Sequence, residues 1–355
     1  EGPLAAEALL ARLGPRPAAA SAGPSRPLEG VRVVEVGPYT AGPLAGRYLA
    51  DLGAEVIKVE SPGGEVTRSW PPRFGGHGGY FVNCNAGKAS VVLDLKAPED
   101  RARFIALVRT SDVLLENLRP GALGKLGLGP ADLRRVAPRL VYASVSGFGR
   151  DAGARPALDS VVQAEAGLMW LVGAGERPQR VGISIADQAA AHAAPLLILA
   201  ALRQRDSTGE GQDVDLAMED VLGWMLELAW PDGDPALAPW STVPAADGWV
   251  VARAESEAVA AVLSGAGELA REGVVARLAA AGIEALAVLE PGEALAHEAV
   301  RRRGLVQAVP TGADATVPVL SAPHRFGRGP LPIGAPPGPA GHDAGRLLDG
   351  LPAEG

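Results

Sequence analysis

The sequence predicts an α/β protein in which a Rossmann-like parallel sheet forms a large domain and a smaller α+β domain follows it. Two observations indicate this fold class. Short apolar runs, such as residues 31–36 and 113–115, suit strands that are buried on both faces, as in a parallel sheet. Segments with apolar residues at helical spacing separate these runs, and this alternation is typical of a sheet with helices on both faces.

The first unit, residues 28–62, predicts a strand, a glycine-bearing turn, a helix and a second strand. Apolar residues recur at helical spacing from Ala45 to Leu52, and Gly53 is a typical helix stop. Residues 56–59 form the expected second strand. Because the free N–H groups and the dipole of a helix N-terminus favour an anion, the turn predicts a seat for the phosphate of a nucleotide.

The glycines of this unit argue against a nicotinamide dinucleotide. That site requires G-x-G-x-x-G, followed after about 20 residues by an acidic residue for the ribose. Glu60 stands at a suitable distance, but Gly37, Gly42 and Gly46 are too widely spaced. A strand–helix–strand unit that binds no ligand remains an alternative.

The remaining elements continue the alternation. Further expected strands are residues 91–95, 113–115 and 140–145, and expected helices are residues 102–108, 130–136, 160–171, 185–203 and 215–230. Strands at 249–252 and 287–289 and helices at 257–264 and 267–280 follow a segment rich in proline and glycine at 231–239. We therefore divide the chain into an N-terminal helix and linker (1–27), a large domain (28–230), a small domain (240–326) and a linker with a short helix that returns to the large domain (327–355).

Charge and composition exclude several classes of function. The formal net charge of −8 over 355 residues argues against a nucleic-acid partner or an anionic membrane surface. The single cysteine, Cys84, excludes an internal disulfide and a zinc site built from cysteines, and we expect no metal. No run approaches the roughly 18 apolar residues of a membrane helix, and no basic signal sequence is evident, so we expect a cytoplasmic protein.

Seven blocks of this sequence resemble one known family, the family III CoA-transferases of the CaiB/BaiF type. This group contains the formyl-CoA and carnitine CoA-transferases, and α-methylacyl-CoA racemase is a close cousin. The blocks are LEGVRVVEVGPYTAGPLAGRYLADLGAEVIKVESP, NAGKASVVLDLK, ENLRPGALGKLGLG, YASVSGFG, LDSVVQAEAGLM, VGISIADQAAAH and RQRDSTGEGQDVDLAMED. Their order and spacing match over about two hundred residues.

The resemblance implies an enzyme that moves CoA from an acyl-CoA donor to a carboxylic acid acceptor. It implies a CoA-binding large domain, coenzyme A as a substrate, no metal, and an interlocked homodimer. In this family an aspartate attacks the acyl thioester to give a mixed anhydride and then an aspartyl-CoA thioester. That aspartate falls on Asp187.

The residues around Asp187 allow two interpretations. Apolar and small residues surround it, which suits a poorly solvated nucleophile at a helix N-terminus. Ser184-x-x-Asp187 also fits a capping box, in which Asp187 only caps its own helix. The resemblance favours the nucleophile. His192 stands five residues later, off the face of Asp187, and is expected to be a packed or surface histidine.

Asp159 and Thr40 are candidate supporting residues. Asp159 precedes a helical run and is an expected N-cap. In the racemase branch a His–Asp pair occupies this place, whereas this chain has Leu158–Asp159, and leucine cannot carry a proton. The formyl-CoA transferase branch has glutamine where Thr40 stands. A 2-methylacyl-CoA racemase-like isomerase and a non-catalytic CoA-binding homologue remain the alternatives.

The resemblance also implies a set of CoA-binding residues. They are Pro38, Tyr39, Thr40, Ser61, Lys88, Asn117, Leu118, Arg119 and Lys125. Lys88, Arg119 and Lys125 would supply cations to the phosphates. For each lysine taken alone, a solvated surface side chain is the alternative.

Overall fold

A computed structural model describes residues 26–153, 155–173, 177–227, 240–311, 315–323, 325–326, 329–349 and 351. The expected N-terminal helix and linker, as far as residue 25, and the segment 231–239 rich in proline and glycine lie outside these residues.

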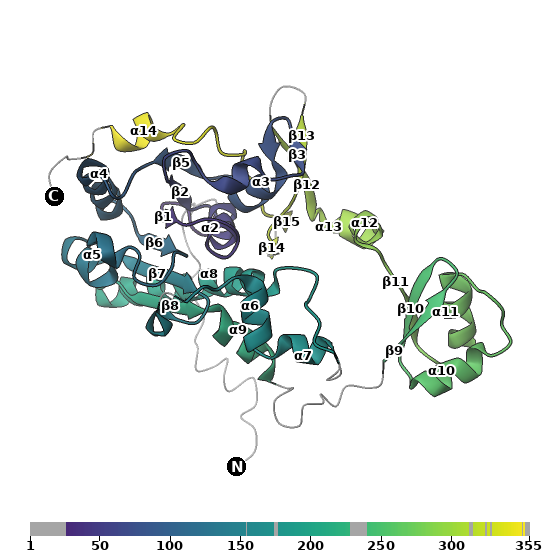
Figure 1. Cartoon of the computed structure of the whole chain (residues 1–355). Coiled ribbons are helices and arrows are strands. Elements are labelled where there is room, and N and C mark those ends of the chain that lie inside the picture. The colour runs from purple at the N-terminus through teal and green to yellow at the C-terminus, as the bar shows by residue number, and fades with distance from the viewer. Residues whose placement is uncertain are drawn as a thin grey trace, which may run out of the picture.

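A six-stranded sheet forms the centre of the larger part of the molecule (Figure 1). Its strands are β1 (Arg32–Val36), β2 (Glu55–Glu60), β5 (Ala89–Val92), β6 (Val113–Glu116), β7 (Val141–Ser146) and β8 (Asp213–Ala217). They lie in the order β5-β2-β1-β6-β7-β8, and every neighbouring pair is parallel. The predicted mixed α/β class with a parallel sheet is confirmed.

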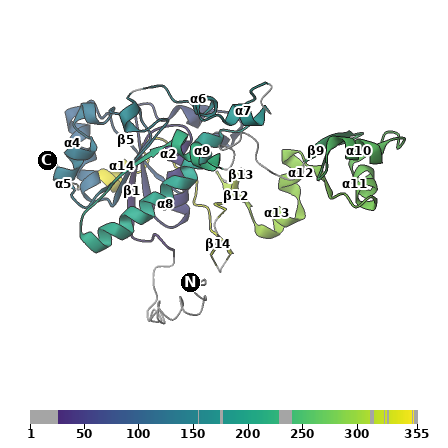
Figure 2. The same ribbon diagram turned by 90° about the horizontal axis from the view of Figure 1, so that it is seen from below.

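Helices cover both faces of this sheet (Figure 2). One face packs on α2 (Ala41–Asp51), α6 (Asp159–Glu165), α8 (Ile185–Thr208) and α9 (Met218–Met225). The other face packs on α4 (Pro98–Arg109), α5 (Pro130–Val136) and α14 (Ala344–Leu348). Successive residues of β1 alternate between the two cores, since Val33 belongs to the first and Val34 to the second.

Two expected helices differ from the structure. Residues 215–217, expected in a helix, end β8, because this segment pairs with β7 at the edge of the sheet and α9 begins only at Met218. The helix expected at 160–171 is broken into α6 and α7 (Leu168–Val172). Gly167 lies between them with a φ of +83°, a left-handed conformation that ends a helix.

The segment after β2 holds elements that the sequence did not reveal. They are η1 (Val66–Ser69), β3 (Arg73–Phe74), β4 (His77–Gly78) and α3 (Gly79–Asn85). The hairpin of β12 (Val306–Pro310) and β13 (Thr316–Leu320) packs on α3 through a small core that includes Val82, Val309 and Val319. Strands β12 and β13 therefore pack on the part of the chain that carries the six-stranded sheet, whereas the sequence grouped them with the small domain.

A second lobe has its own sheet and core. Its antiparallel strands β9 (Ser241–Ala245), β10 (Gly248–Ala252) and β11 (Ala285–Val288) are covered by α10 (Ser256–Leu263) and α11 (Arg271–Ala280). Short elements follow: α12 (Pro291–Ala296), α13 (Glu298–Arg303), β14 (Arg325–Phe326) and β15 (Gly329–Pro330). Two further turns of 3₁₀ helix, η2 (Gly124–Leu126) and η3 (Arg150–Ala152), lie in the larger part.

The C-terminal segment returns to the edge of the six-stranded sheet (Figure 1). The N–H of Gly87 donates to the carbonyl of Ala335 at 2.7 Å. At Ser90 of β5, the N–H donates to Asp343 Oδ2 at 2.9 Å, and the carbonyl accepts from the N–H of Asp343 at 3.0 Å. The outer edge of β5 is thus partly covered.

Helix α8 is, by length and composition alone, long and apolar enough to cross a membrane, unlike the sequence expectation that no segment approaches this. Within its most apolar window, 44% of the residues are buried inside the protein. Core helices of globular proteins meet the same criteria.

Candidate active site

A cavity of about 780 Å³ opens at the carboxyl ends of β1, β6 and β7. Its wall is formed by the turn after β1, the segment after β6 that includes Asn117, the loop after β7, and the first turns of α6 and α8. The chain passes from β1 to β2 on one side and β6 lies on the other, so the cavity stands at a topological switch point of the sheet. Ligands of open α/β sheets bind at such points.

Asp187 lies in the first turn of α8 and lines this cavity. Burial of the side chain, and to a smaller extent the nearby charge of Asp159, together raise the pKa of its carboxyl to about 7. In the part of the chain that the structure describes, no hydrogen bond or ion pair engages the Asp187 carboxylate. It is a half-buried carboxylate that faces an open cavity.

Asp159 is buried and caps α8 from a different helix. Its Oδ1 accepts the N–H of Ala186 at 2.8 Å and the N–H of Asp187 at 3.3 Å, while Oδ2 accepts from Gln163 Nε2 at 2.6 Å. Ser184, the N-cap residue, has no side-chain capping bond. The capping box considered for Asp187 is therefore not formed, because Asp159 takes the free N–H groups.

Asp159 itself is the first residue of α6, and Leu158 occupies the N-cap that was expected at Asp159. Leu158 is 71% exposed and lines the cavity. The position at which the racemase branch has a histidine therefore presents an aliphatic side chain to the cavity.

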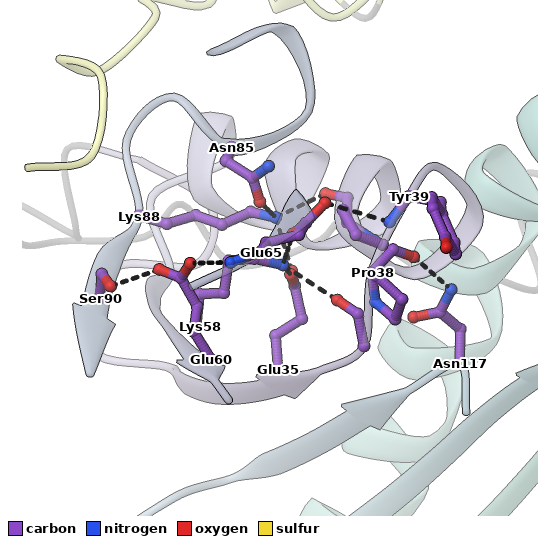
Figure 3. A network of polar contacts seen from close by, with 12 residues as sticks. Glu35, Pro38, Tyr39, Lys58, Glu60, Glu65, Asn85, Lys88, Ser90 and Asn117 are labelled. Carbon is purple, nitrogen blue, oxygen red and sulfur yellow. Dashed lines mark hydrogen bonds and ion pairs between the residues drawn. The ribbon is translucent and has the colours of Figure 1, made fainter. Parts of the chain in front are cut away.

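Four side chains hold the turn that follows β1, and Figure 3 shows three of them, Lys58, Asn117 and Glu65. Lys58 Nζ donates to the carbonyl of Gly37 at 3.0 Å, and Asn117 Nδ2 donates to the carbonyl of Pro38 at 2.9 Å. The N–H of Tyr39 donates to Glu65 Oε1 at 3.1 Å. At the residue after Tyr39, Thr40 Oγ1 is hydrogen-bonded to the hydroxyl of Tyr80.

Aromatic side chains that the sequence analysis did not single out form one wall of the cavity. The ring centroids of Tyr39 and Trp70 are 5.8 Å apart, and those of Trp70 and Tyr80 are 5.3 Å apart. Burial raises the pKa of Tyr80 to about 12, so its hydroxyl stays protonated at neutral pH. Trp70 and Tyr80 belong to the segment 61–85, where no strong periodicity marked an element.

The structure separates the expected CoA-binding residues into two groups. Pro38, Tyr39, Thr40, Asn117, Leu118 and Arg119 line the cavity, together with Asp159 and Asp187. Ser61, Lys88 and Lys125 do not belong to its lining. Ser61 and Lys125 are exposed elsewhere on the surface.

Lys88 has a different environment from the one expected. Its ammonium group is buried and donates to Glu35 Oε2 at 2.6 Å, to the carbonyl of Pro43 at 2.7 Å and to Asn85 Oδ1 at 2.9 Å (Figure 3). These contacts use its three donors. Burial lowers the pKa of Lys88 to about 8. Contact with an external phosphate would require it to leave this site, so the geometry gives it a place in the core rather than in a phosphate patch.

The widely spaced glycines have a structural cause. A Cβ at Gly46 would stand 1.8 Å from Glu35 Oε2, and a Cβ at Gly42 would stand 2.5 Å from Asn117 Oδ1. Both glycines lie on α2, so they admit side chains from β1 and from the end of β6. Their spacing follows the helix surface and the protein's own side chains.

The other candidates of the sequence lie away from the cavity. The ring of His192 packs on Tyr48 with centroids 4.7 Å apart, and its Nδ1 lies 2.7 Å from the carbonyl of Gln188. No group of three or more His, Cys, Asp or Glu side chains within the described ranges is placed to hold a metal ion.

The model of one protein family, CoA-transferase family III, matches residues 28–270. The chain belongs to CoA-transferase family III. The resemblance found in the sequence is thereby confirmed, and the matched residues contain the cavity and all of its aspartates.

Individual relatives agree with this assignment. The family III chain is 43% identical over 204 residues to a probable fatty acyl-CoA transferase of Mycobacterium tuberculosis, covering 56% of this chain and 52% of the relative. It is 37% identical over 249 residues to a succinate–glutarate CoA-transferase of Agrobacterium fabrum, covering 63% and 62%. The chain thus spans between about half and two thirds of the length of these relatives.

Solved structures extend the likeness over more of the chain. A CaiB/BaiF family protein from Brucella suis superposes with a TM-score of 0.80 at 29% identity, covering 92% of this chain and 100% of that one. The mycobacterial protein in an orthorhombic crystal form gives a TM-score of 0.78 at 32% identity, with the same coverage.

Proposed function

We propose that this family III chain is a CoA-transferase that uses Asp187 as its nucleophile. The observation that carries the proposal is the Asp187 carboxylate, which is half-buried, faces the cavity and has no partner among the described residues. A carboxylate attacks a thioester best when little water and no cation must be displaced from it. The raised pKa places half of the population in the ionised form near neutral pH.

The proposed reaction requires only an acyl-CoA and a carboxylic acid as reactants. The Asp187 carboxylate attacks the thioester carbonyl, and the CoA thiolate leaves to give a mixed anhydride. The thiolate then attacks the aspartyl carbonyl, which releases the donor acid and forms an aspartyl-CoA thioester. The acceptor carboxylate attacks the carbonyl of that thioester and expels the CoA thiolate, which gives a second mixed anhydride. The thiolate then attacks the acyl carbon of the acceptor, which forms the new acyl-CoA and releases the Asp187 carboxylate.

The walls of the cavity suit both parts of an acyl-CoA. The turn after β1 and the segment Asn117–Leu118–Arg119 would hold the nucleotide end, as expected for the carboxyl edge of the sheet. Arg119 and Arg155 supply positive charge to the lining. Relatives are named as transferases for succinate and glutarate and for oxalate, so short dicarboxylic acids are the first acceptors to test.

The deciding experiment incubates the protein with a panel of acyl-CoAs and acids and follows new thioesters by mass spectrometry. Hydroxylamine trapping after incubation with acyl-CoA should place a mass shift on Asp187, and the Asp187→Asn variant should show neither exchange nor adduct. If no pair exchanges while the protein is folded and binds CoA, the transferase proposal fails.

The same samples test the two alternatives. Deuterium incorporation at Cα of a 2-methylacyl-CoA without an acceptor acid would indicate an isomerase, although Leu158 offers no proton carrier at the position of the racemase histidine. CoA binding with neither exchange nor deuterium incorporation would indicate a non-catalytic homologue.

We also propose that two copies of the chain pair. Large apolar side chains are exposed along α7, α8 and α9, and they include Trp170, Leu196, Leu197, Leu199, Trp224 and Met225. Exposed apolar surface on this scale is typical of an interface between proteins. An interlocked homodimer of the kind expected from the resemblance would cover it.

A further inference from the structure

Four buried charged side chains form a row of ion pairs that runs from the interior towards the cavity (Figure 3). Lys88 pairs with Glu35 at 2.6 Å, Glu35 pairs with Lys58 at 3.0 Å, and Lys58 pairs with Glu65 at 2.7 Å. All four side chains are at most 4% exposed. Two lysines and two glutamates balance one another, which makes their joint burial tolerable.

Among these four ion-paired side chains, Glu65 contacts a residue of the cavity wall, Tyr39. Its Oε1 accepts the N–H of Tyr39, and its Oε2 pairs with Lys58. Thr67 Oγ1 donates to the same Oε1, and the main-chain N–H of Glu65 donates to Glu60 Oε2 at 2.8 Å. The carboxylate of Glu65 is thus held from three directions and cannot turn away from Tyr39 without losing buried contacts.

Tyr39 needs such a partner because its backbone is in an unfavourable region. It has a φ of +73°, in the left-handed region where a Cβ crowds the carbonyl oxygen. Among the residues that the structure describes, Tyr39 alone has a positive φ without being glycine. Its ring lines the cavity and packs on Trp70. A backbone of this kind persists only where its surroundings fix it.

We propose that Glu65 is a positioning residue, which holds the Tyr39 backbone in its left-handed conformation and keeps the cavity wall ready for the CoA moiety. The inference rests on the proposed function, since it takes acyl-CoA as the ligand of the cavity. Without the Glu65 acceptor, the turn samples other conformations. CoA then binds only to the molecules in which the turn is ordered. The observed Kd rises accordingly, because it equals the intrinsic Kd divided by the fraction of ordered molecules.

If Glu65 had a purely structural role and only neutralised Lys58, Glu65→Asp would bind CoA with the affinity of the parent protein. Glu65→Asp keeps the charge opposite Lys58, whose long side chain can follow it, but withdraws the carboxylate by one methylene from the fixed N–H of Tyr39. Glu65→Ala removes both contacts. The control is Asp51→Asn, which breaks the equally buried Arg47–Asp51 pair at the other end of α2, where neither side chain contacts the turn.

The experiment measures the affinity of each variant for coenzyme A by calorimetry, and kcat and KM for a reactive acyl-CoA. We expect Glu65→Ala and Glu65→Asp each to weaken CoA affinity and to raise KM about tenfold, equivalent to about 1.4 kcal/mol. We expect kcat to stay within about twofold, because saturating ligand restores the ordered turn. Asp51→Asn should leave affinity and KM within about twofold of the parent protein.

Wild-type affinity in Glu65→Asp, or a fall in kcat at unchanged affinity, would overturn the proposal. Glu65→Asp carries the test if Glu65→Ala does not fold. Failure of the proposed function is distinguishable, because a protein that binds CoA but exchanges nothing still gives the affinities that decide the role of Glu65. A parent protein that does not bind CoA overturns the inference.

Discussion

Two carboxylates meet at the N-terminus of α8, and their environments are opposite. Asp159 accepts the free N–H groups of the helix and the amide of Gln163, so its charge is stabilised in the interior. The carboxylate of Asp187, in the first turn of the same helix, receives no such contact and lies beside the charge of Asp159. Burial, and to a smaller extent the charge of Asp159, thereby make Asp187 a stronger base and a better nucleophile.

The pH dependence of the reaction should reflect the ionisation of Asp187. Because kcat/KM reports the free enzyme and the ionised form attacks, we expect it to rise about tenfold between about pH 6 and pH 8, with a midpoint near 7. In Asp159→Asn the amide oxygen can still cap Ala186, but the neighbouring charge is gone, so the midpoint should move to lower pH. An unchanged midpoint in that variant would show that Asp159 does not act on Asp187.

The same pKa predicts how Asp187 affects folding. The folded pKa lies above the unfolded value of 3.8, so the native state binds a proton more readily and its stability falls as the pH rises from about 4 to about 7. Asp187→Asn removes this penalty. Urea unfolding should show the variant to be more stable than the parent at about pH 8, with the gain shrinking towards about pH 4. A variant that is less stable at pH 8 would contradict the burial of a charged Asp187.

At the scale of the element, α2 shows why helix propensity is a poor guide here. Glycine in a helix interior normally costs stability relative to alanine. Gly42 and Gly46 are nevertheless required, because the side chains of Asn117 and Glu35 occupy the space where their Cβ atoms would stand. Helix α2 lies close against β1 and the end of β6, and it begins directly after the turn that lines the cavity.

Gly46→Ala should therefore destabilise the protein although alanine favours helix. The new Cβ would overlap Glu35 Oε2 and disturb its ion pair with Lys88, at an expected cost of about 2 kcal/mol in the free energy of unfolding. Gly124→Ala is the matched control, since a Cβ at Gly124 meets nothing within 4 Å. Urea midpoints check the pair, with a change within about 0.5 kcal/mol expected for the control. Equal midpoints for the two variants would refute the packing argument.

The sequence predicted elements best where a strong pattern stood alone. The apolar run of β1 and the long periodicity of α8 were located to within a few residues. Residues 215–217 were misassigned because a sheet edge, which no local pattern records, pairs them with β7. Asp187 and the turn after β1 were predicted as parts of the candidate site. Trp70, Tyr80 and Glu65 were not predicted, because only tertiary packing brings their short segment to the cavity.

At the scale of the whole molecule, the exposed apolar surface of α7, α8 and α9 predicts self-association. Leu196 is 69% and Trp224 is 75% exposed, and both belong to helices that also pack on the core. We expect a dimer by analytical ultracentrifugation, and Leu196→Glu combined with Trp224→Glu should shift it to monomer because a buried charge opposes association. The exposed Lys96→Glu serves as the control and should leave the mass unchanged. A parent protein that sediments as a monomer would contradict the proposed pairing.

The return of the C-terminal segment to β5 has a consequence for synthesis. Ser90 meets Asp343, and Arg68 donates to the carbonyl of Gly338, across some 250 to 270 intervening residues. While the ribosome makes the second lobe, the sheet can already assemble, but the edge of β5 still lacks this cover. The segment that covers this edge emerges from the ribosome after the sheet and the second lobe, so premature termination before it would leave the edge of β5 open to pairing with other chains.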